Sequence, residues 1–204
     1  IISLSTGING LGNRAAINFI KGLPIEVPST FIITNVQLID GSGTPAKKAA
    51  VRIQGKRIIA VGNLQPFKDE TVIDGGGKIL APGFIDSHSH LEGSLSEYPE
   101  AIAALSQGIT TIVCGQDGYS DPVDSIKAML KTKPAAINVA TYTGHTSIRE
   151  KIMGAENLSR PATKDELEKI KQLLKEDLQK GSLGLSSGLE YEGAFYSDRN
   201  EVIE

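Results

Sequence analysis

Two histidines, His88 and His90, stand two positions apart at the end of an apolar run, Ala81–Ile85. Successive side chains of a strand point to opposite faces, so Asp86, His88 and His90 are expected on one face at the strand's C-terminal end. Two imidazoles that converge on one point suit a divalent ion such as zinc. A His-x-His pair also occurs on exposed strands without any function. The apolar run favours the metal site, because polar side chains at a buried strand end must be satisfied together.

A third histidine, His145, follows a predicted strand at 137–142 and precedes a helix that we expect to begin at Ser147. Ser147 and Glu150 have the spacing of a capping box. The positive end of a helix dipole disfavours an imidazolium ion, so a neutral histidine here could donate a hydrogen bond to a developing oxyanion. The same histidine could instead bind a backbone group and have only a structural role.

Asp117 and Arg149 each allow two interpretations. The Asp117 carboxylate, shortly after an apolar strand at 110–114, could ligate a divalent ion, but Asp117-Gly118 is also a common turn dipeptide. Arg149 could hold a substrate carboxylate through two parallel hydrogen bonds, or it could form a structural ion pair. Cys114 lies within the strand, and we expect a buried apolar residue there rather than a ligand.

The composition is that of an ordinary soluble globular protein. Among 204 residues, 21 are Lys or Arg and 24 are Asp or Glu, which gives a net charge of −3. No block of like charge marks a nucleic-acid or anionic-membrane surface, and no apolar run reaches the roughly 18 residues of a membrane span. The single cysteine excludes an intramolecular disulfide framework. We expect a soluble protein of the cytoplasm or periplasm with no nucleic-acid or membrane partner.

Three regions follow one another along the chain. Residues 1–30 hold no recognisable signal peptide, and their Gly, Asn and Ser content favours an irregular arm. Residues 31–80 hold short Ile- and Val-rich runs between glycine-rich turns, at spacings that favour antiparallel pairing in a small β domain. From 81 to 204, strand and helix signals alternate, which predicts a parallel α/β sheet.

The region 81–204 contains four strand-helix units. A closed (β/α)₈ barrel takes roughly 250 residues, so this region corresponds to about half of one. The capping box of Thr163 and Glu166 opens the strongest helix, and Asp198 is expected to begin another. The predicted strands are 83–88, 110–114, 137–142 and 182–189, and the main predicted helices are 99–107, 121–130 and 164–180.

Several stretches together resemble a known family. Ala81–His90 is similar to the signature of the amidohydrolase superfamily, metal-dependent hydrolases on a (β/α)₈ TIM barrel. The strands at 35–43 and 51–62 resemble the small N-terminal β-sandwich domain of such enzymes. Thr143–Arg149 and Gly184–Tyr191 resemble motifs of the D-aminoacylases, the N-acyl-D-amino-acid deacylases. The resemblance runs from about residue 31 to the end and implies a β-sandwich at 31–80 followed by the first half of the barrel at 81–204.

The resemblance also implies a set of site residues. His88 and His90 match the first pair of metal ligands of the family. Asp117 stands where the best-known members have a ligand cysteine, and a carboxylate there is compatible with one or two divalent ions, zinc or, since oxygen is the harder donor, manganese. The expected substrate-binding residues are His145, Arg149, Tyr191 and Glu190.

The implied activity is hydrolysis of the N-acyl amide bond of N-acyl-D-amino acids by metal-activated water. In the family, two more histidine ligands and a catalytic aspartate come from later barrel strands, and no histidine follows His145 here. We therefore expect no catalytic general base within this chain and a complementary C-terminal half of the barrel or a second chain as its partner. Two alternatives remain: a sister amidohydrolase acting on cyclic amides or isoaspartyl dipeptides, and a non-catalytic fragment that serves as a binding or structural module.

Overall fold

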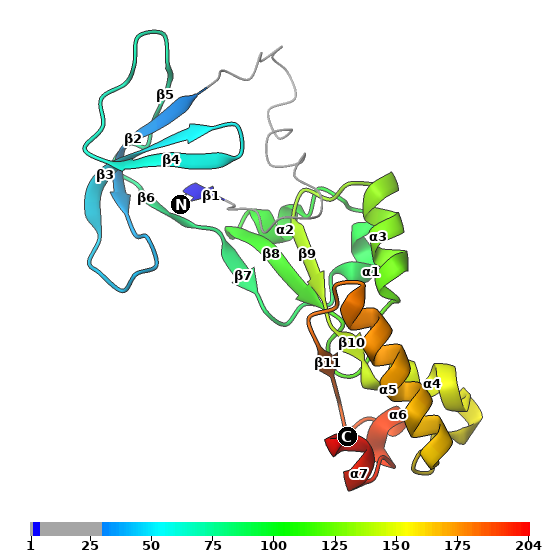
Figure 1. Ribbon diagram of the computed structural model, residues 1–204. Coiled ribbons are helices and arrows are strands. Elements are labelled where there is room, and N and C mark those ends of the chain that lie inside the picture. Colours follow the sequence, from blue (N-terminus) through cyan, green and yellow to red (C-terminus); the bar gives the residue numbers. More distant parts are fainter. Residues whose placement is uncertain (1, 5–29) are drawn as a thin grey trace. The chain divides into compact units, whose positions relative to one another are not determined.

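The computed structural model describes residues 2–4 and 30–204 (Figure 1). The described chain divides into two compact units. The first comprises the described residues up to Ile85 together with Glu100–Thr111 and Ala136–Asn138, and the second comprises Asp86–Pro99, Ile112–Ala135 and Val139–Glu204. The irregular arm expected at 1–30 lies outside the described residues, except for residues 2–4 and 30.

The first unit is built around one mixed β-sheet. Its strands follow the order β1-β6-β2-β3-β4, and β5 also pairs with β2. Neighbours β2/β3 and β3/β4 are antiparallel, as the turn spacing predicts, whereas β5 and β6 pair with β2 in parallel. The strands are β1 (Ile2–Leu4), β2 (Phe31–Leu38), β3 (Lys47–Gln54), β4 (Arg57–Gly62), β5 (Thr71–Asp74) and β6 (Ile79–Pro82).

An irregularity in the middle of β2 divides one of its edges between two partner strands. The register of β2 against β3 shifts between Ile33 and Val36, where Asn35 has a φ of 52°. The residues before this bulge pair with β5, and those after it pair with β6. A bulge re-aims the strand beyond it, so one strand can serve two partners on the same edge. The buried core of this sheet comprises Ile33, Val36, Leu38, Val51, Ile53 and Leu80.

The strands that carry the candidate site form two short sheets. One has the order β7-β8-β9, and the other pairs β10 with β11 in parallel. The N–H of Phe84 donates to the carbonyl of Gly108, and the N–H of Ser89, five residues on, donates to the carbonyl of Val113, also five residues on. The two segments therefore run in the same direction, as in parallel pairing. The strands are β7 (Phe84–Asp86), β8 (Ile109–Cys114), β9 (Asn138–Thr141), β10 (Thr143–Gly144) and β11 (Leu185–Ser186).

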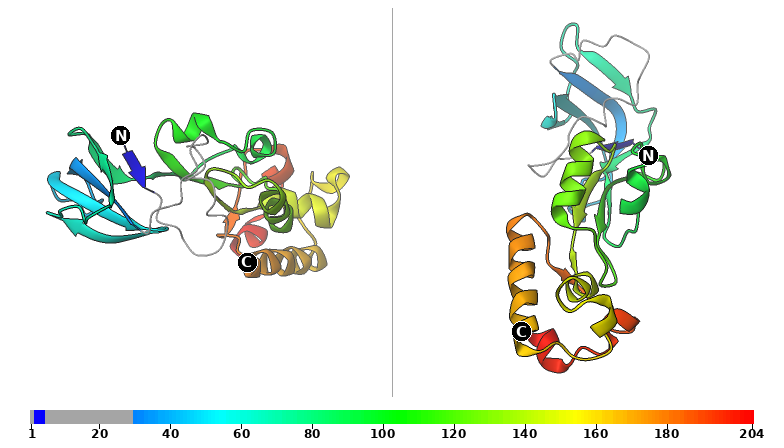
Figure 2. Two further views of the ribbon diagram at one scale, coloured as in Figure 1. Left: turned by 90° about the horizontal axis from the view of Figure 1, so that it is seen from above. Right: turned by 90° about the vertical axis from the view of Figure 1, so that its right-hand side faces the viewer.

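Helices alternate with these strands, which confirms the α/β class. Helix α5 packs against α4 and β10 (Figure 2). The described residues form no closed barrel. None of the helices in the described part of the chain combines the length and apolar character that crossing a membrane requires. The helices are α1 (Glu92–Leu95), α2 (Ile102–Leu105), α3 (Val123–Thr132), α4 (His145–Met153), the 3₁₀ helix η1 (Ala155–Asn157), α5 (Lys164–Gln179), α6 (Glu192–Phe195) and α7 (Arg199–Ile203).

Local helix signals gave mixed results. The capping box of Thr163 and Glu166 is present at the start of α5, and the Asp198 side chain caps α7. The prediction that Ser147 begins a helix is wrong, because α4 begins two residues earlier with Gly144 as its N-cap. The Ser147 hydroxyl instead accepts a hydrogen bond from the N–H of Ser120, at 2.9 Å. The helix expected at 99–107 is reduced to α2, since Ala101 adopts a left-handed conformation before it.

Candidate functional site

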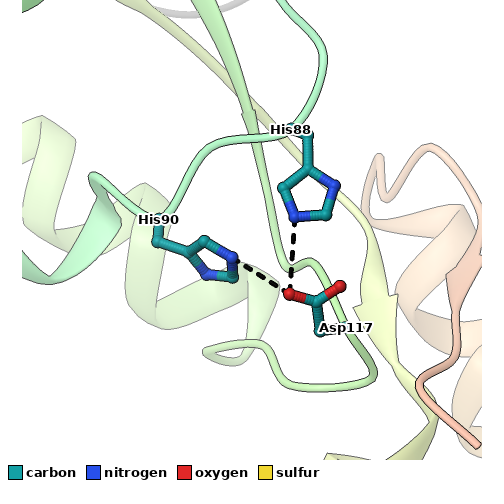
Figure 3. A group of neighbouring side chains, drawn as sticks. All are labelled: His88, His90 and Asp117. Atoms are coloured by element: carbon teal, nitrogen blue, oxygen red, sulfur yellow. Dashed lines mark hydrogen bonds and ion pairs between the residues drawn. The ribbon is translucent and has the colours of Figure 1, made fainter.

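Three side chains that are distant in the sequence converge in the second unit (Figure 3). The Nε2 atoms of His88 and His90 lie 3.4 and 3.1 Å from Oδ2 of Asp117. The two imidazole rings are 5.3 Å apart between centroids and meet edge to face. Both histidines are exposed, and Asp117 is half-buried. The two imidazoles are therefore accessible to solvent.

The residue between the two histidines is buried and bonded to β8. Ser89 is buried, and its N–H donates to the carbonyl of Val113 in β8, at 3.0 Å. The chain bends at Ser87 and His88 after β7 ends at Asp86, and both histidine side chains lie on the exposed side. Asp86 was expected on the same face, and its Oδ1 accepts a hydrogen bond from the N–H of His88, at 3.2 Å. Asp86 therefore holds the loop backbone and is not one of the converging side chains.

Asp117 lies on a tightly enclosed loop after β8. It has a φ of 57°, a left-handed conformation that aspartate tolerates better than most residues. The following residue, Gly118, donates its N–H to the hydroxyl of Ser186 in β11, at 3.3 Å. A Cβ added to Gly144 would come within 2.4 Å of the Gly118 carbonyl oxygen, and one added to Gly188 within 2.5 Å of the Asp117 carbonyl oxygen. The loop is thus fixed by close backbone packing from both sides.

The donor set fits a divalent metal ion. Two imidazole nitrogens and one carboxylate oxygen lie within 4.8 Å of one another, and within the described part of the chain they form the group of His, Cys, Asp and Glu atoms that meets this spacing. Nitrogen and oxygen donors of this kind suit zinc. A bound ion would take the place of the direct contacts between Asp117 Oδ2 and the two imidazole rings. The three residues could therefore hold a metal, with room for ligands from elsewhere on the exposed side.

Cys114 does not belong to this donor set. It is fully buried at the end of β8. Burial, and then the nearby Glu92 carboxylate, raise the pKa of its thiol to about 12. A thiol that stays protonated at neutral pH is a poor metal ligand, because the thiolate is the form that binds. These features agree with the expectation of a buried apolar residue.

A second polar cluster surrounds His145, the first residue of α4. His145 is buried, its Nδ1 lies 3.1 Å from Oγ of Ser187, and its Nε2 lies 3.1 Å from Oε1 of Glu201 in α7. Both ring nitrogens therefore have partners within the described chain. A substrate-binding role for His145 stays a prediction, and in this structure the side chain joins the start of α4 to α7.

Arg149 lies one turn further along α4 and is completely enclosed. Its guanidinium forms an ion pair with Glu201 and donates to the carbonyl of Gly193, at 2.9 Å. It also donates to the carbonyl oxygens of Leu158 and Arg160. Every contact of the guanidinium is thus internal, as the structural alternative requires, and its role toward a substrate remains a prediction.

Glu201 is the residue of this cluster that sequence reasoning missed. Glu201 lies three residues after the Asp198 cap, so the sequence suggests only a role in capping α7. Burial pulls the pKa of its carboxyl upward, but hydrogen bonds from His145, Arg149 and the N–H of Ala162 outweigh burial and lower the pKa to about 2. The carboxylate is therefore ionised and serves as the shared acceptor of the cluster. Its partners lie in distant parts of the chain, so no local signal identifies it.

The two remaining predicted site residues, Tyr191 and Glu190, are exposed. The Tyr191 ring packs over Gly188. A Cβ built on Gly188 would lie 2.5 Å from Tyr191 Cδ2 and 2.5 Å from the Asp117 carbonyl oxygen. Tyr191 is consequently a neighbour of the Asp117 loop, and Glu190 precedes it at the end of a turn.

Comparisons with known proteins show which enzymes the chain resembles. No family model matches the chain. The chain is 37% identical to an N-acyl-D-aspartate deacylase of Alcaligenes xylosoxydans xylosoxydans, covering 85% of this chain and 39% of that protein. It is 32% identical to a D-aminoacylase of the same organism, covering 87% and 41%.

Solved structures agree with these relatives. A D-aminoacylase with a binuclear metal centre matches with a TM-score of 0.78 at 31% identity, covering 85% of this chain and 41% of that one. An N-acyl-D-glutamate deacylase from Bordetella bronchiseptica, complexed with zinc and a phosphonate inhibitor, matches with a TM-score of 0.79 at 31% identity, covering 84% and 41%. The chain spans about two fifths of the length of these relatives. Over most of its own length, the chain is therefore similar to the D-aminoacylases, a subset of the amidohydrolases.

Proposed function

We propose that the protein takes part in hydrolysing the N-acyl amide bond of N-acyl-D-amino acids as a metal-dependent amidohydrolase. The observation that carries this proposal is the convergence of His88, His90 and Asp117 in a chain that is 37% identical to an N-acyl-D-aspartate deacylase. Zinc is the favoured ion for two imidazoles and a carboxylate, and manganese is compatible with the carboxylate.

Each residue of the metal site has a defined task. His88 and His90 would hold the ion through Nε2, and Asp117 through Oδ2, since these are the atoms that converge. When bound, a divalent ion supplies an activated water and polarises an acyl carbonyl. The chain's own contribution is to keep the three donors together on the segments that follow β7 and β8, with both imidazoles exposed.

The residues around the Asp117 loop are proposed to bind the substrate. Tyr191 is exposed beside the loop and could cover the acyl-amino acid, with Glu190 next to it. His145 and Arg149 are enclosed, so we propose that they act from behind the site by holding Ser187 and α4 in place. The four residues thus divide into an outer pair that a substrate can touch and an inner pair.

We further propose that residues 31–80 form a small β-sandwich domain and residues 81–204 the first half of a (β/α)₈ barrel. Several strand residues that a complete barrel or sandwich would cover are exposed, among them Phe84, Ile85 and Leu185. Apolar strand faces of this kind need a covering partner. The complementary part of the barrel, on the same or a second chain, would cover them and supply the remaining metal ligands and the proton-transfer group.

The proposal is tested by assaying the chain together with its complementary part. We expect release of free amino acid from N-acetyl-D-amino acids, loss of that activity on treatment with a chelator, and recovery with Zn²⁺. N-acetyl-L-amino acids, a cyclic amide and an isoaspartyl dipeptide serve as comparison substrates. Cleavage of the cyclic amide or the isoaspartyl dipeptide alone, or activity that survives complete metal removal, would contradict the proposal.

A further inference from the structure

One buried carboxamide bonds to both strand ends that carry the candidate metal ligands. Gln116 is only 8% exposed, and its Nε2 donates to the carbonyl oxygens of Ser87 and Val113, each at 2.9 Å. Ser87 immediately precedes His88, and Gln116 itself immediately precedes Asp117. The amide therefore joins the two segments at positions next to a ligand on each side.

The carbonyls that accept from this amide belong to a small hydrogen-bond network. The carbonyl of Val113 accepts a second hydrogen bond from the N–H of Ser89, the residue between the two histidines. Both hydrogens of the Gln116 amide are used, one toward each segment. The histidine segment is thus held at Ser87 and at Ser89, on both sides of His88, by groups that belong to β8 and the loop after it.

The loop that carries Asp117 turns sharply. Gly115, Asp117 and Gly118 all have left-handed φ values, of 71°, 57° and 83°. Glycine adopts this conformation freely and aspartate tolerates it, so the loop reverses direction within four residues. Gln116 lies within this loop, and its side chain bonds to the carbonyl of Ser87. The segment after Ser87 carries the two histidines that the Asp117 carboxylate contacts.

We propose that Gln116 is the positioning residue of the metal site, which sets the separation between the His88/His90 pair and Asp117. This inference rests on the proposed metal-binding function. Partners that orient metal ligands from behind typically contribute about 10- to 100-fold to metal affinity. Gln116 holds the peptide backbone next to the ligands rather than the ligand side chains themselves, so its removal changes the geometry of the donor set without removing any donor.

The test compares Gln116→Met with Asn138→Leu in the chain assembled with its complementary part. Methionine keeps the length and volume of glutamine and removes both hydrogen-bond donors. Asn138 is the matched control, because its Nδ2 donates to the carbonyl of Thr110 and so joins β9 to the other end of β8. Zinc affinity is measured by calorimetry well below the melting temperature, and the site geometry by the visible absorption of bound Co²⁺.

We expect Gln116→Met to raise the Kd for Zn²⁺ by about 10- to 100-fold and to change the Co²⁺ spectrum, while Asn138→Leu leaves both unchanged. Should Gln116→Met fail to fold, Gln116→Asn carries the comparison, because its shorter amide can reach only one of the two carbonyls and should weaken binding. A wild-type Kd and spectrum in the folded Gln116 variant, or equal weakening in Asn138→Leu, would overturn the inference. A wild-type assembly that binds no metal would instead refute the proposed function itself.

Discussion

His145 Nε2 and Glu201 Oε1 lie 3.1 Å apart, although 56 residues separate them in the sequence, and both side chains are buried. The same carboxylate oxygen accepts a hydrogen bond from Arg149. Its other oxygen accepts one from the N–H of Ala162, at 3.0 Å. One carboxylate on α7 therefore fixes α4 and the segment before α5, and with them the loop at Ser187.

Replacing Glu201 by glutamine should destabilise the protein strongly. Glutamine keeps the shape of the side chain but leaves the enclosed Arg149 guanidinium without a counter-charge. Breaking one partner of a buried ion pair typically costs about 3–5 kcal/mol, and we expect a loss of this size in urea denaturation. The control is Glu168→Gln, which breaks an exposed pair with Lys171 and should cost less than about 1 kcal/mol. Equal losses in the two variants would contradict a special role for Glu201.

The stability contributed by Glu201 should also depend on pH. The pKa of its carboxyl is lowered from an ordinary value of 4.5 to about 2, so its stabilisation is complete above about pH 4.5 and is lost as the pH falls toward 2. The difference in unfolding free energy between the wild type and Glu201→Gln should accordingly shrink from pH 6 to pH 3. Glu70 and Glu166 also have pKa values of about 2, but they are present in both proteins and cancel in the difference. A constant difference over this range would show that the carboxylate is not the cause.

Sequence reasoning found the elements whose signals are local. Thr163 with Glu166 forms a capping box within one helical turn. His88 and His90 do converge, but the strand predicted at 83–88 ends at Asp86, so both lie on the bend after it and not on the strand. For Asp117 the sequence leaves two alternatives, of which the ligand is favoured, because its position after β8 also suits a turn. The structure brings its carboxylate to the two histidines, which the turn alternative by itself does not require.

The remaining features depend on contacts between distant segments. The role of Glu201 requires α4 and α7 to meet, and the role of Gln116 requires the backbone of Ser87 to lie beside its amide. No spacing of residues near Glu201 or Gln116 in the sequence indicates such contacts. The division of β2 between β5 and β6 likewise depends on the bulge at Asn35, which the apolar pattern of the strand does not reveal.

Asp117→Cys should keep zinc binding and change the metal preference. The family resemblance places a cysteine ligand where this chain has Asp117, and a thiolate is a softer donor than a carboxylate. We expect the variant to bind Zn²⁺ about as well as the wild type and Mn²⁺ much more weakly, as measured by calorimetry. Asp117→Ala should weaken both ions, and Asp121→Ala, which removes an exposed carboxylate four residues away, should weaken neither. Undiminished Zn²⁺ affinity in Asp117→Ala would show that Asp117 is not a ligand.

Gly188→Ala should disturb the metal site although residue 188 carries no ligand. A Cβ there would lie within 2.5 Å of both the Asp117 carbonyl oxygen and the Tyr191 ring, and the carbonyl cannot move without moving the loop. We expect a loss of stability of about 1–3 kcal/mol from overpacking, together with a higher Kd for Zn²⁺. Gly93→Ala is the control, because a Cβ at that position in α1 meets nothing within 4 Å. If Gly188→Ala lost stability but bound Zn²⁺ like the wild type, the tight packing at Gly188 would support the fold alone, and Asp117 would not depend on it.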